Sequence, residues 1–280
     1  MWNDKEKAPV LEFLGWVLLL SLASEIILLL LEPYSISYMT DGTLTVGYIV
    51  YAVIGIFLST PNPMIAAAIV LKRHGKIRSV RDFCALVLRT EHIGKTVLIT
   101  GVFCGAALCA AILNGTRTDS PWYLLPLALP VMVIGGGVEE IGWRGFLQPA
   151  LEKRFPFPSA TVLVAIIWYT WHLPMWLQPS SNHYGDSLIG FGITIFVWSF
   201  AGAAIYKSTK SVIACVMYHA FMNSIGAVYD WNSLFDAFPK TPGMILYFSV
   251  LFAGAVILWI AADRKERKGP LRRALHPDHH

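Results

Sequence analysis

Long apolar runs separated by short polar segments dominate the chain. A helix rising about 1.5 Å per residue needs about 20 apolar residues to cross a hydrocarbon core of about 30 Å, and eight stretches are that long. They run from about Leu11 to Leu31, between Asp41 and Lys72, between Lys95 and Arg117, from Pro121 to Pro149, from Pro158 to Trp176, from Ser187 to Tyr206, from Ser211 to Tyr229 and from Thr241 to Ala262. The pattern predicts an all-α polytopic membrane protein with about eight transmembrane helices and a polar cavity within the membrane.

Lys and Arg residues are distributed very unevenly among the predicted loops. Of the 22 Lys and Arg residues, all but three fall in the termini and alternate loops on one side of the membrane. The exceptions are Arg117 and Lys240 on the other side and Arg144 inside the fourth stretch. Because cytoplasmic loops carry the excess of basic residues, we expect a multi-pass protein of the cell membrane with both termini in the cytoplasm.

Two local patterns refine this topology. Pro61 and Pro63 interrupt the second stretch, which predicts a kink or a new helix start there. The cytoplasmic segment from Ile77 to Leu88 has apolar residues at helical spacing among charged ones, which is typical of a helix lying on the membrane surface. No cleavable signal peptide is evident at the N-terminus, so we expect the first helix to remain as an anchor.

Composition agrees with a membrane protein. The chain is 55% hydrophobic and 14% charged, against about 25% charged residues in soluble domains. A formal net charge of +4 argues against a nucleic-acid partner. Without an internal repeat or a linker, residues 1–280 are predicted to form one membrane domain, with a core at about 121–229 and a basic cytoplasmic tail at 263–280.

Ionisable residues inside the predicted spans point to a site, because each costs about 2.5–3.5 kcal/mol to place in hydrocarbon. The densest group is Glu139, Glu140 and Arg144 in the fourth stretch. Glu140 and Arg144 are four residues apart and share a helix face, which predicts a salt bridge that supports the site. Glu139 is turned by about 100° from Glu140 and has no partner in its own helix, so it is the better catalytic candidate.

Two further stretches supply polar groups that Glu139 can meet. His172 lies in the aromatic-rich fifth stretch, and His219 and Asn223 lie four residues apart in the seventh. A carboxylate and a histidine can together deprotonate a water, while a second histidine and an amide donate hydrogen bonds to an oxyanion. These groups predict hydrolysis of an amide bond. The alternative is a divalent metal such as zinc bound by Glu139, His172 and His219, although an HExxH motif is absent.

At these residues the chain resembles the CPBP family of intramembrane proteases, which includes the CAAX prenyl endopeptidases and the bacteriocin-processing and self-immunity proteins. The family pattern of EExxxR, FxxxH and HxxxN corresponds to Glu139-Glu140 with Arg144, Trp168 with His172, and His219 with Asn223. Trp168 replaces the usual phenylalanine. The resemblance covers about residues 121–229.

The resemblance implies an eight-helix protease in which Glu139 and His172 activate the water, His219 and Asn223 stabilise the oxyanion, and Glu140 and Arg144 organise the site. Whether the mechanism is glutamate-dependent or metal-dependent stays open. Short loops suit a prokaryotic member, so the expected substrate is a membrane-associated peptide or protein, such as a bacteriocin-like precursor, rather than a prenylated CAAX protein.

Each motif also has a purely structural interpretation. Alone, Glu140 with Arg144 would be a structural ion pair, His219 with Asn223 an interhelical hydrogen-bonding pair, and His172 a packed histidine. Glu25 is expected to snorkel or to pair helices, with a role in the cavity as the less favoured alternative. The tryptophans of the fifth stretch are expected to face lipid or pack at an interface. His183 and His92 receive no role. The rival functions are a catalytically silent scaffold or immunity protein and a proton-coupled transporter.

Overall fold

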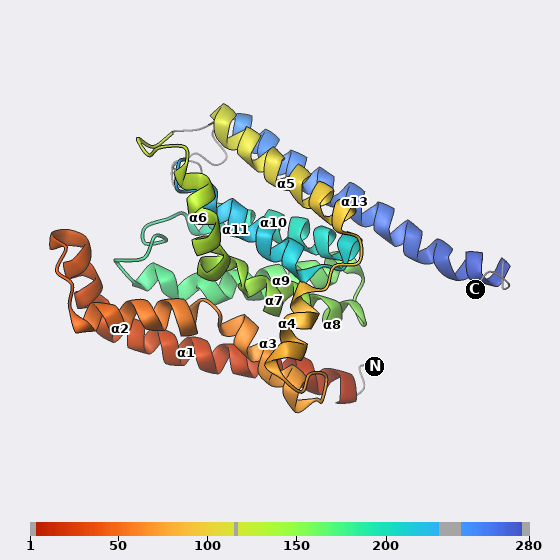
Figure 1. Ribbon diagram of the computed structural model, residues 1–280, viewed down its shortest axis with the longest axis horizontal. Helices are drawn as coiled ribbons and strands as arrows, with labels where there is room; N and C mark the ends of the chain where they lie inside the picture. The colour runs from red at the N-terminus through yellow and green to blue at the C-terminus, as the bar shows by residue number, and fades with distance from the viewer. Residues whose placement is uncertain (1–3, 115–116, 230–241, 276–280) are drawn as a thin grey trace.

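The computed structural model describes residues 4–114, 117–229 and 242–275, and Figure 1 shows them as a bundle of helices. The helices are α1 (Asp4–Asp41), α2 (Val46–Ile54), α3 (Asn62–Arg73), α4 (Val80–Leu88), α5 (Ile93–Asn114), α6 (Leu124–Met132), α7 (Glu139–Gly142), α8 (Gln148–Glu152), α9 (Phe157–His172), α10 (Leu188–Thr209), α11 (Val212–Ile225) and α13 (Pro242–Leu275). The described residues contain no strand. Arg117 and Tyr229 form one isolated β-bridge between two loops. The predicted all-α class is confirmed.

Short segments of tighter or wider helix extend several of these helices. Gly55–Ser59, Val133–Gly137 and Trp143–Leu147 are π-helical, and Leu173–Leu177 is a 3₁₀ turn. Such π-helical segments often lie at functional sites. Two of the three flank the Glu139–Gly142 helix that carries the predicted carboxylates.

Four helices are long and apolar enough to cross a membrane, namely Ala8–Asp41, Ile93–Leu113, Phe157–Leu177 and Leu188–Thr209. Two bent pairs raise the number to six if each pair is one span. The apolar helix α11 is shorter than these spans. Thr241, at the start of the last predicted span, lies outside the described residues, as do Lys240 and residues 276–280 of the predicted tail. The count of about eight spans therefore stays a prediction.

The two bent pairs are broken at identifiable residues. Val46–Ser59 and Asn62–Arg73 meet at 47°, and Pro61 and Pro63 stand at the start of the second helix, which confirms the predicted break. Leu124–Gly137 and Glu139–Glu152 meet at 44°, directly after a run of three glycines. This second break places Glu139 at the first position of α7.

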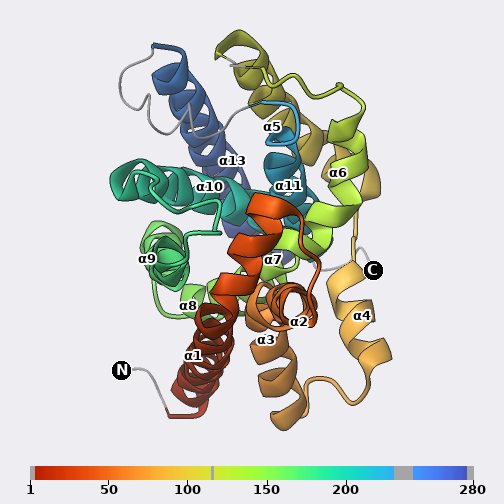
Figure 2. The same ribbon diagram turned by 90° about the vertical axis from the view of Figure 1, so that its left-hand side faces the viewer.

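Helix α10 lies at the centre of the bundle. In its apolar window 72% of the residues are buried, against 17% for α1. It packs against α9, α11 and α13, while α5 and α13 run side by side along one edge and α1 with α2 and α3 forms the opposite edge (Figures 1 and 2). The broken helix from α6 to α8 therefore passes between these two edges.

Glycines allow that broken helix to pack closely against its neighbours. A Cβ atom added at Gly137 would lie 2.8 Å from the Val216 carbonyl oxygen on α11. One added at Gly142 would lie 2.5 Å from the Pro63 carbonyl oxygen on α3. Small residues permit such close approaches between membrane helices. They fix α7 between α3 and α11.

Helix α4 forms where the sequence predicts a surface helix. Ser79 caps it by accepting the Asp82 backbone N–H at 3.2 Å, and the Asp82 carboxylate accepts the backbone N–H groups of Arg78 and Ser79. The bonds to its carboxylate hold the pKa of Asp82 below its usual value, and the bond from the Arg78 N–H contributes most. The reciprocal bonds form a capping box, which explains why the helix starts at Val80.

Candidate active site

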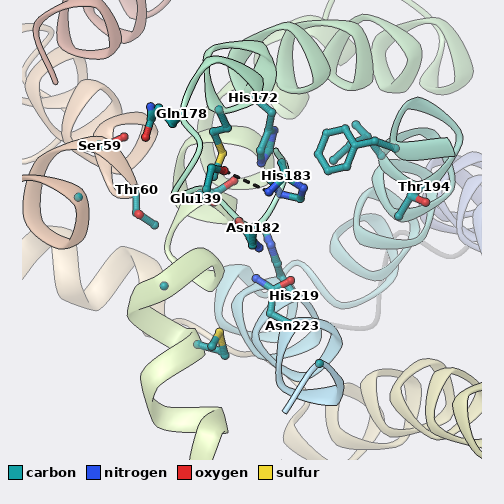
Figure 3. Close-up of a pocket in the computed structure, with 18 of the residues that line it drawn as sticks. Ser59, Thr60, Glu139, His172, Gln178, Asn182, His183, Thr194, His219 and Asn223 are labelled. Atoms are coloured by element: carbon teal, nitrogen blue, oxygen red, sulfur yellow. Dashed lines mark hydrogen bonds between the residues drawn. The ribbon is translucent and has the colours of Figure 1, made fainter. Parts of the chain in front are cut away.

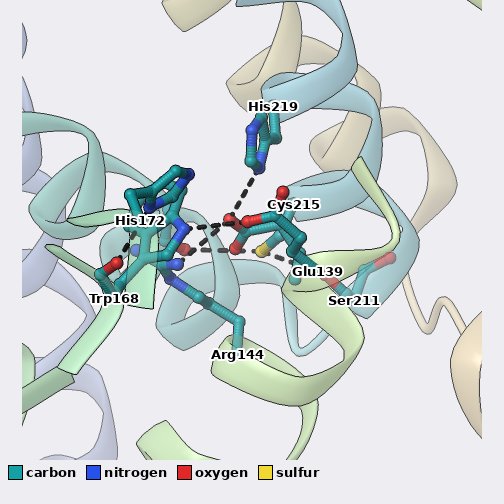
Figure 4. Close-up of polar contacts among 9 residues, drawn as sticks. Glu139, Arg144, Trp168, His172, Ser211, Cys215 and His219 are labelled. Carbon is teal, nitrogen blue, oxygen red and sulfur yellow. Dashed lines mark hydrogen bonds and ion pairs between the residues drawn. The ribbon is translucent and has the colours of Figure 1, made fainter. Parts of the chain in front are cut away.

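A buried network joins Arg144 and His219, both labelled in Figure 4, through the carboxylate of Glu140. Arg144 Nη1 donates to Glu140 Oε1 at 3.0 Å, and His219 Nδ1–H donates to the same oxygen at 3.1 Å. The side chains of Arg144 and Glu140 are 0% and 2% exposed. The predicted salt bridge is confirmed, and it also fixes His219 from another helix.

Glu139 points away from this pair, as its rotation along the helix predicts. Its partner comes from α9, where the Trp168 indole Nε1–H donates to Glu139 Oε2 at 2.8 Å. Trp168 is buried, so the expectation that the tryptophans of this span face lipid or an interface is wrong for it. A phenylalanine, the usual residue of the family pattern, has no N–H to donate to the carboxylate.

Trp168 is also the packing centre of the site. Its ring lies 5.9 Å from the His172 ring and 5.3 Å from the His219 ring, measured between centroids. The Arg144 guanidinium carbon lies 4.7 Å from the centroid of the Trp168 ring, a cation–π contact. One indole thus contacts residues from all three sequence motifs.

His172 is held in one orientation at the end of α9. Its Nδ1–H donates to the Trp168 backbone carbonyl at 2.9 Å. A carbonyl only accepts, so Nδ1 carries the proton and Nε2 of the neutral ring is left as an acceptor. His172 lines the same cavity as Glu139 (Figure 3).

His219 and Asn223 meet at the glycine run of the broken helix. A Cβ atom added at Gly136 would lie 2.3 Å from Asn223 Nδ2 and 3.2 Å from His219 Nε2. Both nitrogens therefore face the space above Gly136. The four-residue spacing along α11 places them on one face, as predicted.

A cavity of about 1000 Å³ connects these groups. Glu139, His172, His219 and Asn223 all line it, whereas Glu140 and Arg144 are not among its lining residues. The four predicted catalytic residues thus face the cavity, and the two predicted supporting residues lie behind it. The volume is at the upper end of the range for ligand sites, which leaves room for a peptide segment.

Two cavity residues were not predicted as part of the site. Glu25 of α1 accepts a hydrogen bond from Ser59 Oγ at 2.8 Å and one from the Gln178 amide, so it joins α1 to other elements, one of the two roles expected for it. His183 donates from Nδ1 to Asp186 at 3.0 Å and stacks on Trp176. The charge of Glu25 within an apolar stretch is a usable sequence signal, but a histidine in a loop carries none.

The predicted alternative of a metal site requires three ligands close together. In the part of the chain that the structure describes, no group of three His, Cys, Asp or Glu side chains is arranged so that it could hold a metal ion. Glu139, His172 and His219 line one cavity without forming such a group. Each histidine holds its Nδ1 in a hydrogen bond, which leaves Nε2 as the nitrogen that can meet a water or a metal.

The central part of the chain matches a known family. Residues 121–225 match the profile described as type II CAAX prenyl endopeptidase Rce1-like. This segment is therefore similar to the type II CAAX prenyl endopeptidases, in agreement with the family resemblance of its motifs. A CAAX prenyl protease 2 of Methanococcus maripaludis is 27% identical over 100 residues, which cover 33% of this chain and 37% of that relative. The chain thus spans little more than a third of the length of the curated relative it matches.

The matched segment contains all six residues of the predicted site, from Glu139 to Asn223. It lies within the core predicted at about residues 121–229. The part of the cavity wall that comes from α1 and α2 lies outside it.

Proposed function

We propose that this protein is an intramembrane endopeptidase that hydrolyses peptide bonds of membrane-associated substrates. The observation that carries the proposal is the convergence of Glu139, His172, His219 and Asn223, from three helices, on one cavity. The family match supports the same activity. Whether a substrate carries a prenyl group is left to the experiment below.

In the proposed reaction a water lies between the Glu139 carboxylate and His172 Nε2. Glu139 takes a proton from the water as the oxygen attacks the carbonyl carbon of the substrate, and His172 orients the water as a hydrogen-bond acceptor. The fixed Nδ1–H bond of His172 supports this role, because it leaves Nε2 unprotonated. The Trp168 N–H holds the Glu139 carboxylate in place.

The oxygen that becomes negatively charged is stabilised above Gly136. The Asn223 amide donates to it, and His219 Nε2 donates when both ring nitrogens carry a proton, with Nδ1–H held by Glu140. Glu139 then passes its proton to the amine as the carbon–nitrogen bond breaks. The products are a carboxylic acid and an amine, and the carboxylate of Glu139 is regenerated.

The test is cleavage of a panel of prenylated and unprenylated peptides by purified protein in detergent. We expect Glu139→Gln and His172→Ala each to abolish cleavage while thermal unfolding stays close to wild type. Glu91→Gln is the matched control, because Glu91 is exposed, pairs with Arg89 and does not line the cavity. Retained cleavage in the Glu139 variant would contradict the proposal.

The same panel separates the remaining alternatives. Cleavage that survives a strong zinc chelator supports activation of water by carboxylate and histidine, whereas cleavage lost in the chelator and restored by zinc assigns a metal-dependent enzyme. A silent scaffold would bind peptides equally well with and without Glu139→Gln. A transporter would instead give substrate-dependent proton flux in vesicles.

A further inference from the structure

The interior of the bundle is tightly packed on the α8 side of Glu139. Along the chain after Glu139, the side chains of Trp143, Leu147 and Gln148 are fully buried and fill the interior toward α8. The Glu140–Arg144 pair lies in the same region and is itself buried. Among the described residues, none of those that line the cavity lies on α8 or in the α8–α9 connection.

The other end of the cavity is lined by loops. Residues 117–118, 178, 180–183, 226–227 and 229 contribute to its wall, and they lie at the end of the bundle where α9 ends and α10 begins (Figures 1 and 3). Non-helical backbone at the edge of a membrane protein is tolerated where it borders water or a water-filled cavity. The entrance is therefore expected at this end.

Polar contacts build the rim of that entrance. The Ser180 backbone N–H donates to Glu32 Oε1 at 2.6 Å, and the Ser180 hydroxyl contacts Glu32 Oε2 at 3.1 Å and the Tyr51 hydroxyl at 3.0 Å. These bonds tie the loop after α9 to α1 and α2. A polar rim of fixed shape suits an aqueous entrance.

The distribution of basic residues distinguishes the two ends. Among the described residues, the only Lys or Arg in the loops at the entrance end is Arg117. At the other end in Figure 1, the α3–α4 connection carries Lys76 and Arg78, and the α8–α9 connection carries Lys153 and Arg154. The positive-inside rule indicates that this basic end is cytoplasmic and that the entrance faces away from the cytoplasm.

We propose that substrates reach the site from the extracytoplasmic face. This inference rests on the proposed function, because it assumes that the protein cleaves a peptide substrate. It narrows their class to membrane-anchored peptides or proteins whose cleaved segment is exposed outside the cytoplasm. A protein displayed on the cytoplasmic leaflet would meet the tightly packed end of the bundle.

Accessibility of single cysteines tests the direction without any need for activity. Gly135 lines the cavity beside the site, and a Cβ atom there would meet only the Met132 sulfur, at 3.7 Å. We would place Gly135→Cys in a chain with all four native cysteines replaced by alanine. The matched control is Lys76→Cys in the same cysteine-free chain, at an exposed position of the α3–α4 connection at the other end. The probe is a small anionic, membrane-impermeant thiosulfonate.

Right-side-out and inverted vesicles then give opposite results. We expect Gly135→Cys to be modified in right-side-out vesicles and protected in inverted ones, with Lys76→Cys showing the reverse. Modification of Gly135→Cys only from the inverted side, or equally from both, would overturn the proposal. Asn182→Cys, at an exposed rim position, repeats the test if Gly135→Cys does not fold.

Cleavage in the same vesicles separates this inference from the proposed function. An impermeant peptide should be cut by right-side-out vesicles and spared by inverted ones. If neither preparation cuts any peptide, the proposed function fails while the labelling result still decides the direction of access. Cleavage by inverted vesicles alone would overturn the direction and leave the protease assignment intact.

Discussion

Arg144 neutralises a carboxylate that water does not reach. Removing it by Arg144→Ala leaves Glu140 with His219 as its remaining hydrogen-bond partner, in a region where Glu140 and Arg144 are both almost fully buried. Breaking a buried ion pair by deleting one partner costs about 3–5 kcal/mol. We expect a loss of that order in unfolding free energy, measured by denaturant titration in mild detergent, together with lower activity.

The matched control is an ion pair of similar length at the surface. Arg89 and Glu91 are 2.9 Å apart, but their side chains are 69% and 48% exposed. An exposed pair contributes about 0–1 kcal/mol, so Arg89→Ala should change stability little. Equal losses in the two variants would show that burial of the Glu140–Arg144 pair has no special cost.

For single residues, the sequence predicts contacts within one helix better than contacts between helices. The Glu140–Arg144 pair follows from a spacing of four residues. The bond from Trp168 to Glu139 joins residues 29 positions apart, and nothing in their own helices indicates it. Only the packing of α9 against the broken helix brings the indole to the carboxylate.

The glycine run before α7 is the element on which the site geometry depends. Gly136→Ala would place a methyl group 2.3 Å from Asn223 Nδ2 and 3.2 Å from His219 Nε2, so both side chains would have to move. Loss of one oxyanion donor typically costs about 10²–10³ in kcat. We expect a fall of that order, measured with a peptide that the wild-type protein cleaves.

Gly135→Ala provides the control within the same run. Its added methyl group would meet only the Met132 sulfur, at an ordinary 3.7 Å. Activity should therefore stay close to wild type. If Gly135→Ala were as inactive as Gly136→Ala, flexibility of the glycine run, rather than the space it leaves for Asn223, would be the important property.

The two helix breaks differ in how far the sequence predicts them. Pro61 and Pro63 indicate the first, because proline cannot continue a helix. The second follows glycines, which permit a break without requiring one, so the 44° bend after Gly137 was not predicted. Packing against Val216 and Pro63 decides it. The π-helical turns on both sides of α7 likewise have no sequence signal.

At the scale of the whole molecule, two parts of the chain build the cavity. All predicted catalytic residues lie in the segment matched to the family, whereas α1, α2 and the turn after α2 contribute the opposite wall with Glu25, Tyr51 and Ser59. Groups on that wall do not belong to the proposed chemistry. They are therefore expected to affect which substrates bind more than how fast a bound one reacts.

Glu25 offers a test of this division. Glu25→Gln keeps the shape of the side chain and its ability to accept from Ser59, but it removes the negative charge and puts an amide nitrogen in place of the oxygen that accepts from Gln178. A single ion pair with a bound peptide is worth about 1 kcal/mol, or roughly fivefold in affinity. We expect KM for lysine-containing peptides to rise by about that factor, with kcat unchanged and with apolar peptides unaffected.

Glu12 on the same helix is the matched control, because it pairs with Arg73 and His74 and is not among the residues that line the cavity. Glu12→Gln should leave KM and kcat unchanged for every peptide. If Glu25→Gln instead lowered kcat with KM constant, Glu25 would act on the reacting groups, and the division of the cavity into a chemical wall and a binding wall would be wrong. A rise in KM alone would show that residues outside the matched segment select the substrate, which is how members of one family with the same catalytic residues would come to cleave different peptides.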